Sequence, residues 1–157
     1  MDNHEGIARV RAALAAAGIE DRTRLFAEPA RTSPEAAQAL ACDVAQIAKS
    51  IVFRGEGDRP VLVVASGANR VDESKVAALL GYGLGKANAA YVREVSGFVI
   101  GGVSPIGWLT QPAVLLDRDL LALRECWAAA GHPNAMMRLT SDELQRLTQA
   151  SAADIAA

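Results

Sequence analysis

The sequence predicts a single mixed α/β domain whose sheet contains antiparallel strands. Two segments rich in β-branched residues, 46–54 and 61–66, flank a short stretch with glycine, aspartate and proline, 55–60, and this pattern predicts a β-hairpin. Segments with the apolar spacing and caps of helices lie before and after this pair. Because strands come in hairpins as well as next to helices, a mixed or antiparallel sheet is favoured over a doubly wound parallel one.

The composition fits one globular domain. The chain has 157 residues, of which 51% are hydrophobic and 22% are charged, which is enough for one core and argues against disorder. We therefore expect residues 1–157 to form a single domain. The formal net charge of −2 supplies no general attraction for nucleic acid, so any such contact has to be local.

Several classes of protein are excluded by what the sequence lacks. The start of the chain has no basic segment followed by an apolar core, and each apolar run is interrupted by Gly, Asp or Arg. We therefore expect a soluble, cytoplasmic protein without membrane contact. Cys42 and Cys126 lie far apart and predict buried thiols. His4 and His132 have no second ligand at a useful spacing, so we expect no metal and no cofactor.

Five segments have the apolar spacing or the capping residues of α-helices. They are residues 6–17, 33–41, 72–81, 88–97 and 140–149. Gly18 and Gly81 are typical C-caps, and Ser33 is the expected N-cap of a helix with proline at its first position. Asp72 predicts the start of the third helix. Thr140 begins a capping box, with glutamate three residues later.

The remaining strands are short or ambiguous. Strands are predicted for residues 19–26, 98–100 and 113–117. Alanine favours a helix in 124–139, but the strong turn at 131–134 predicts a second hairpin there. Residues 150–157 are expected to be a fraying tail.

Lys49 is the least expected residue of the first hairpin. Alternation along the strand places it on the same face as Ile47, Ile51 and Phe53. Burying an ammonium without a partner costs several kcal/mol or neutralises it. Lys49 therefore either turns out to solvent or faces a cleft in which a cation is useful, and the residues alone leave both open.

The loop 101–107 is a second candidate for chemistry. Gly101 and Gly102 permit a close backbone approach and free two N–H groups, and Pro105 stiffens the loop. Such a loop can bind an oxyanion or a terminal carbonyl. A plain tight turn between two strands explains the same residues.

Two other stretches carry weaker signals. Residues 66–70 follow the end of a strand, where Asn69 and Arg70 could contact a carboxylate or phosphate, although a solvated loop is the plainer interpretation. Residues 81–87 are rich in glycine, but Leu80 takes the place of the first glycine of a phosphate loop and Ala87 takes the place of its hydroxyl residue. We therefore reject a phosphate loop.

Four segments taken together resemble the YbaK and prolyl-tRNA-synthetase-associated family of aminoacyl-tRNA editing domains, over about residues 33–147. They are residues 46–53, 66–72, 95–107 and 130–134. The resemblance implies an α/β (α+β) domain with a curved, mixed, barrel-like sheet surrounded by helices. It also implies hydrolysis, in trans to a synthetase, of the ester that joins a wrong amino acid to the 3′ end of tRNA.

The resemblance also implies roles for particular residues. Lys49 would be the family's hallmark lysine, and Gly101 with Pro105 would form its GxxxP loop, so Lys49 and Gly101 are the expected catalytic residues. The expected substrate-binding residues are Ser50, Ser66, Asn69, Gly102, Ser104, Pro105 and His132. The expected partners are the aminoacyl-tRNA 3′ end and, as an option, a synthetase.

Some points remain open at this stage. Trp108 and Leu109 stand where relatives often carry polar or basic residues, which predicts a different access for the substrate. The amino acid removed could be Cys, Ala, Ser or Thr, because shape alone discriminates small side chains weakly. The alternative function is a non-catalytic module that holds a small ligand or a synthetase in the same cleft. A hydrolase of another small ester or amide is a third possibility.

Overall fold

The computed structural model describes residues 4–157, and every statement below concerns this part of the chain. Its strands are β1 (Thr23–Leu25), β2 (Ile47–Arg54), β3 (Pro60–Ser66), β4 (Gly85–Lys86), β5 (Ala113–Asp117), β6 (Glu125–His132), β7 (Ala135–Thr140) and β8 (Ala152–Ala153). Its α-helices are α1 (His4–Ala16), α2 (Ser33–Leu40), α3 (Glu73–Leu80), α4 (Ala89–Ser96), α5 (Arg118–Leu121) and α6 (Ser141–Thr148), and its 3₁₀ turns are η1 (Val44–Gln46) and η2 (Glu56–Asp58).

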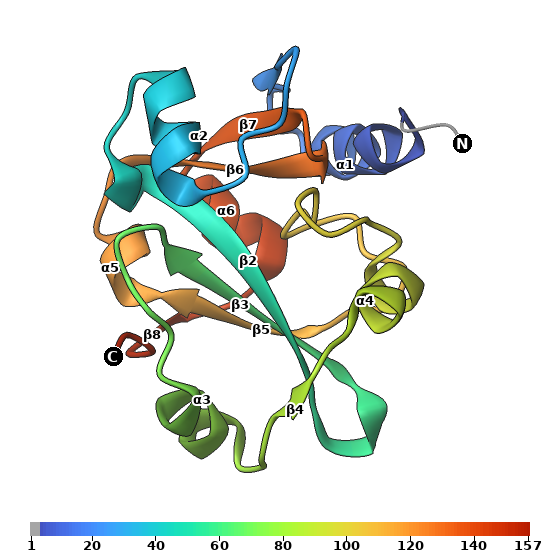
Figure 1. Ribbon diagram of the computed structural model, residues 1–157, viewed down its shortest axis with the longest axis vertical. Coiled ribbons are helices and arrows are strands. Elements are labelled where there is room, and N and C mark those ends of the chain that lie inside the picture. The colour runs from blue at the N-terminus through green and yellow to red at the C-terminus, as the bar shows by residue number, and fades with distance from the viewer. Residues whose placement is uncertain (1–3) are drawn as a thin grey trace.

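The strands form one eight-stranded mixed sheet with the order β1-β7-β6-β2-β3-β5-β8, and β4 pairs with β2 outside this path. Both predicted hairpins are present, because β2 pairs antiparallel with β3 and β6 pairs antiparallel with β7. The pairs β2–β6, β3–β5 and β5–β8 are parallel. Helices lie around this sheet (Figure 1), so the predicted mixed α/β fold is confirmed.

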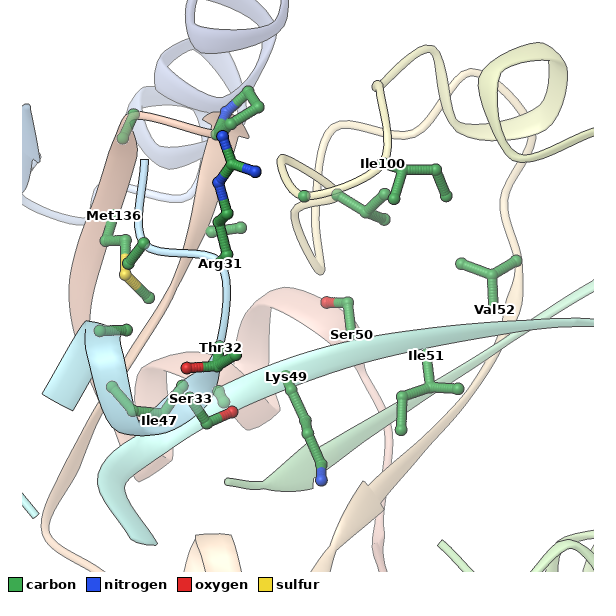
Figure 2. A pocket seen from close by; sticks show the side chains of 18 of the residues that line it. Arg31, Thr32, Ser33, Ile47, Lys49, Ser50, Ile51, Val52, Ile100 and Met136 are labelled. Atoms are coloured by element: carbon green, nitrogen blue, oxygen red, sulfur yellow. The ribbon is translucent and has the colours of Figure 1, made fainter. Parts of the chain in front are cut away.

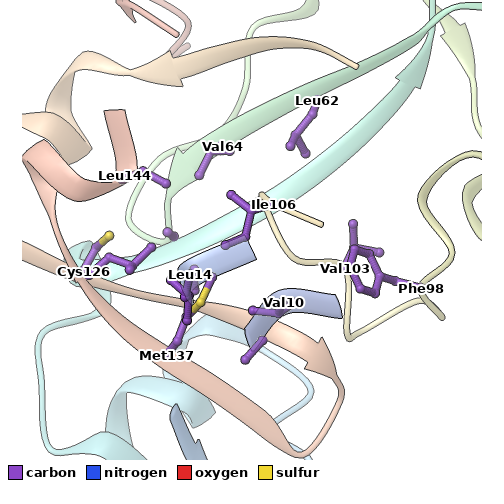
Figure 3. Close-up of a cluster of buried hydrophobic side chains, with 14 of the residues drawn as sticks. Val10, Leu14, Leu62, Val64, Phe98, Val103, Ile106, Cys126, Met137 and Leu144 are labelled. Atoms are coloured by element: carbon purple, nitrogen blue, oxygen red, sulfur yellow. The ribbon is translucent and has the colours of Figure 1, made fainter. Parts of the chain in front are cut away.

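Apolar side chains fill three clusters on both faces of the sheet. The largest joins Val10 and Leu14 of α1 to Leu62 and Val64 of β3 (Figure 3). The opposite face of β3 packs against Val76 of α3. A smaller cluster lies between α2 and Ile47 of β2, and contains Ala36, Ala37 and Leu40. Strand β3 is therefore buried along its whole length.

Most of the predicted helices are confirmed, and the caps explain their limits. Asp72 accepts from the N–H groups of Ser74 and Lys75 at the start of α3, and Gly81 ends that helix with φ +82°. Thr140 and Glu143 form the predicted capping box of α6. The N-cap of α2 is Thr32 and not Ser33, because the Thr32 side chain accepts from the N–H of Glu35.

Two predictions for the chain after α4 were wrong, and one helix was missed. Residues 98–100 are not a strand, because the N–H of Gly102 donates to the carbonyl of Val99 at 3.0 Å and turns the chain. Residues 150–157 are not a fraying tail, because they contain β8 and because Ile155 is fully buried. The short helix α5 was not predicted.

Some expectations concern residues that the structure does not describe. Residues 1–3 and the side chain of His4 lie outside the described residues. The predictions that the start of the chain is no signal peptide and that His4 binds no metal concern these residues. Within residues 4–157, no helix has the length and apolar character needed to cross a membrane.

Candidate active site

A cavity of about 540 Å³ opens between the segment before α2, strand β2 and the segment after α4. We call it the main cavity. Its walls include Arg31 and Thr32 on one side, Ser50 and Val52 on β2, and Ile100 opposite them (Figure 2). The ends of β6 and β7 close the remaining side with alanines and Met136. The main cavity is thus built from three stretches that are far apart in the sequence, within residues 30–52, 87–103 and 129–136.

Strand β2 presents two neighbouring polar residues to opposite sides. The side chain of Ser50 points toward the space below Arg31 and Ile100, and the side chain of Lys49 points away from it (Figure 2). This follows from the alternation of side chains along a strand. The hydroxyl of Ser50 is buried and has no hydrogen-bond partner within residues 4–157. Lys49 and Ser50 both contribute to the lining of the main cavity.

The ammonium of Lys49 is held by a backbone carbonyl. Its Nζ donates to the carbonyl oxygen of Asn69 at 2.5 Å. Lys49 is half-buried, and no carboxylate lies within ion-pair distance of it in the described part of the chain. The lysine is therefore neither free in solvent nor buried without a partner. A neutral acceptor holds the charge beside the cavity and leaves it uncompensated.

The position of the Asn69 carbonyl depends on Asp117, which sequence reasoning missed. Asp117 is fully buried at the end of β5. Its Oδ2 accepts from the backbone N–H of Ser66 at 3.0 Å and from Nδ2 of Asn69 at 2.9 Å. Its Oδ1 accepts from the N–H of Asp119 at 2.9 Å. The carboxylate at the end of an apolar strand, Ala113–Asp117, was the available signal for it.

Ser66 and Asn69 therefore lie outside the main cavity. The hydroxyl of Ser66 donates to the carbonyl of Ala45 at 2.7 Å, and Nδ2 of Asn69 also donates to Asp119 at 2.9 Å. These bonds fix the loop after β3. Both residues were predicted to bind substrate. In the structure they do not line the main cavity, and they lie in the loop whose Asn69 carbonyl accepts from Lys49.

The glycine loop, which we define as residues 97–107, brings Gly101 to the main cavity. Gly101 has φ +91°, a conformation that favours glycine. Gly102 packs on the backbone of His132, where a Cβ would lie 2.8 Å from its Cα. The N–H groups of Gly101 and Gly102 were both expected to be free. Within residues 4–157 only that of Gly101 has no acceptor, because the N–H of Gly102 donates to the carbonyl of Val99.

The other predicted site residues face elsewhere. Ser104 is fully buried, and its carbonyl accepts from Nε1 of Trp108 at 2.6 Å. Pro105 and Trp108 line a second cavity, next to α1 and α6. Nδ1 of His132 accepts from the N–H of Asn134 at 3.0 Å. Of the nine predicted residues, Lys49, Ser50 and Gly101 line the main cavity.

The lining of the main cavity carries positive charge and no acid. Arg31, which sequence reasoning missed because it lies in the irregular segment before α2, joins Lys49 in the lining. None of the described lining residues is Asp, Glu, His or Cys. Residues 4–157 also contain no group of three or more potential metal ligands. The arrangement can attract an anion and present a backbone donor, but it offers no side chain as a general base.

Comparisons with known proteins show the family of this chain. Residues 27–147 match the family described as Aminoacyl-tRNA editing domain. The chain is 34% identical over 123 residues to the uncharacterized protein YwhH of Bacillus subtilis (strain 168), covering 78% of each chain. It is 36% identical over 96 residues to Proline--tRNA ligase of Limosilactobacillus fermentum, which is 58% of this chain and 17% of the ligase. A crystal structure described as a candidate trans-editing enzyme for prolyl tRNA synthetase superposes with a TM-score of 0.91, at 42% identity and 98% coverage of both chains.

Proposed function

Since the chain belongs to the aminoacyl-tRNA editing domain family, we propose that it is a trans-editing deacylase, which hydrolyses the ester between a wrong amino acid and the 3′-terminal adenosine of tRNA. The observation that carries this proposal is the composition of the main cavity. Lys49 and the backbone of Gly101 line a cavity of about 540 Å³, and the ammonium of Lys49, which points away from it to the Asn69 carbonyl, has no carboxylate partner in the described residues. A cation suits a nearby phosphate, and a backbone N–H suits the oxyanion that forms from an ester.

The proposed reaction divides the tasks among three residues. The amino acid enters the main cavity beside Ser50, and the backbone N–H of Gly101 stabilises the oxyanion that forms on the ester carbonyl, an effect of about 3 kcal/mol for one donor elsewhere. Water adds to the carbonyl carbon, and the ester bond to the ribose oxygen breaks. The ribose oxygen takes up a proton, which leaves a free amino acid and an intact tRNA.

Lys49 would bind the end of the tRNA. In the structure its Nζ has a neutral carbonyl as partner, and a phosphate is a stronger partner for an ammonium. Lys49 can therefore exchange the Asn69 carbonyl for the terminal phosphate or polarise the ester. Because the described cavity lining contains no general base, we propose that a ribose hydroxyl of the substrate orients the attacking water.

The size and charge of the protein limit its substrate. We propose a small amino acid such as Cys, Ala, Ser or Thr, and the two prolyl-system relatives favour a tRNA of the proline type. The net charge of −2 favours recognition of the acceptor end over wrapping of the whole tRNA. A synthetase partner would supply further affinity. Such a protein would act in the cytoplasm, where tRNA is charged.

The test is hydrolysis of a panel of mischarged tRNAs by the wild-type protein and by Lys49→Ala. We expect release of one or a few amino acids, and a loss of about 10²-fold or more in the variant, as is typical when one charge-stabilising donor is removed. Lys86→Ala is the matched control, because Lys86 is exposed on β4, next to β2, and does not line the main cavity. Full activity of Lys49→Ala with an unchanged thermal midpoint would contradict the proposal.

One observation favours the alternative, a non-catalytic module for a small ligand or a synthetase. The described lining of the main cavity contains no acid and no histidine, so this lining offers no side chain that could activate water by itself. Binding of charged tRNA or of a synthetase without hydrolysis, and with the same loss in Lys49→Ala, would establish this alternative.

A further inference from the structure

We propose that Arg9 of α1 is a positioning residue that holds the glycine loop, and with it Gly101, in the wall of the main cavity. The inference rests on the proposed function, because it concerns the loop that would stabilise the oxyanion. Arg9 lies outside residues 27–147, which match the editing family. Its role would therefore be supplied by a helix outside the matched range, which packs into the same core.

Arg9 bonds to both ends of the glycine loop. Its Nη2 donates to the carbonyl of Ser96 at 3.0 Å, and its Nε donates to the carbonyl of Gly107 at 3.1 Å. A guanidinium is planar and carries its donors at fixed angles. The two carbonyls are therefore kept at a fixed separation, which sets how the loop between them leaves the body of the protein.

The start of the loop is shaped for this contact. The guanidinium lies over the ring of Phe98, 4.5 Å from its centroid, in a cation–π arrangement. Gly97 has φ +80°, and a Cβ there would lie 2.5 Å from Nη2 of Arg9. Two features therefore favour glycine at position 97: the close approach of the guanidinium, and the left-handed backbone that ends α4.

The remainder of the loop divides into a buried part and an exposed tip. Val103 and Ile106 belong to the same apolar cluster as Val10, the residue after Arg9 (Figure 3). Ile100, by contrast, is 61% exposed, and Ile100 and Gly101 line the main cavity. Because Arg9 holds the base of the loop on α1, it also restricts where Ile100 and Gly101 at the tip meet the main cavity.

Loss of the guanidinium would have two effects. The carbonyl of Gly107 would lose its donor and that of Ser96 would keep only the N–H of Leu109, at 3.3 Å, so the base of the glycine loop would become more mobile and Gly101 would be held less firmly. A small misplacement of a group that acts on the reacting atoms can cost about 10²-fold in rate. The wall that contains Ile100 would also become less well defined, so larger amino acids would be tolerated better.

The experiment compares Arg9→Ala and Arg9→Lys with Arg11→Ala. Arg11 is on the same helix and pairs with Asp21 at 2.8 Å, away from the glycine loop. We measure kcat/KM on the best mischarged tRNA and on one whose amino acid has an additional methylene. Arg9→Ala should lose roughly 10- to 100-fold on the best substrate and also lose selectivity. Arg9→Lys should be intermediate, because it keeps the charge but its single ammonium nitrogen lacks the planar fork that reaches both carbonyls. Arg11→Ala should match wild type.

The selectivity ratio separates positioning from mere loss of folded protein, because the folded fraction cancels when two rates of one variant are divided. An unchanged rate and ratio in Arg9→Ala would overturn the proposal. Hydrogen exchange of peptides that cover residues 97–107 tests the loop without any substrate. Faster exchange in Arg9→Ala alone supports the proposal, and exchange equal to wild type overturns it. If the wild type hydrolyses no charged tRNA, the proposed function fails while the exchange result still decides the role of Arg9.

Discussion

At the scale of single residues, Asp117 has more partners than any group in the main cavity. Its two oxygens accept three hydrogen bonds, from Ser66, Asn69 and Asp119, in a site closed to solvent. A buried carboxylate with several donors is costly to alter, because each donor left without an acceptor pays its full desolvation cost. The loop that presents the Asn69 carbonyl to Lys49 therefore depends on a residue that does not line the cavity.

We expect Asp117→Asn to destabilise the protein by about 2–3 kcal/mol, because an amide nitrogen would face a donor and the remaining bonds would lose the charge. It should also reduce deacylation, since Lys49 would lose its fixed acceptor. Urea unfolding and the mischarged-tRNA assay measure the two effects.

Asp119→Asn is the matched control for this change. The carboxylate of Asp119 accepts from Nδ2 of Asn69 on the exposed side of the loop, so we expect a loss below about 1 kcal/mol. Equal losses in the two variants would show that the buried position of Asp117 has no special importance.

Lys49 shows what single residues reveal before a structure is known. The strand and the alternation identified it as unusual, but the structure meets neither alternative fully, because Lys49 lines the main cavity while its ammonium points away from it to a backbone carbonyl. The carbonyl partner could not be foreseen, because it is on a loop twenty positions away whose path depends on Asp117. The roles expected for Ser66 and Asn69 remain predictions, and their contacts favour support of that loop.

At the scale of elements, the C-terminal segment completes the second face of the sheet. Ile155 is fully buried in the cluster that also contains Val61, Val63 and Val76. Its carbonyl accepts from the N–H of Asp72 at 2.8 Å, just before α3. The segment thus joins the start of α3 to β5, which pairs with β8.

We expect Ile155→Ala to cost about 2–5 kcal/mol, the usual range for truncation of a fully buried aliphatic side chain. Leu79→Ala is the control, because Leu79 is 55% exposed on α3 and its truncation should change stability by less than about 0.5 kcal/mol. Thermal or urea unfolding measures both. A small effect of Ile155→Ala would mean that the segment is not a structural part of the domain.

Elements were predictable where local signals agreed. Caps and turns identified both hairpins and the helices α3 and α6 with nearly correct limits. Predictions failed where tertiary contacts decide the conformation. The alanine-rich end of the chain has no local preference for a strand, and it becomes β8 only because β5 is beside it. Phe98 was predicted to begin a strand. Its ring is buried against Arg9 of α1, and the chain turns directly after it instead of continuing as a strand.

At the scale of the whole molecule, one ion pair joins the segment just before β1 to helix α6, which is far from it in the sequence. Arg22 donates to both oxygens of Glu143, at 2.9 Å and 2.7 Å, and both side chains are largely buried. The hydrogen bonds from Arg22 hold the pKa of Glu143 below its ordinary value. A carboxyl whose pKa is lowered by folding adds stability above its unfolded pKa of about 4.3, and this contribution is lost as the pH falls through the folded pKa.

We therefore expect Glu143→Gln to be less stable than wild type at pH 7, by about 2 kcal/mol, and the difference to shrink as the pH is lowered below about 4.3. Urea midpoints of both proteins from pH 7 to pH 3 give this comparison. Glu125→Gln should show almost no difference at any pH, because Glu125 and Arg138 are half exposed and 3.8 Å apart. A difference in stability between Glu143→Gln and wild type that stays the same from pH 7 to pH 3 would contradict the role given to the Glu143 carboxylate.

The strand order also determines when the main cavity forms during folding. Strand β1 pairs with β7 and β2 pairs with β6, so neighbours in the sheet come from distant parts of the chain. Such topologies close long loops before they gain contacts and fold in about milliseconds to seconds. The walls of the main cavity come from the segment before α2, from β2 and from β7, and they meet only after these slow pairings. Refolding protein should therefore recover the proposed deacylation no earlier than its complete sheet, and no partly folded species should catalyse it.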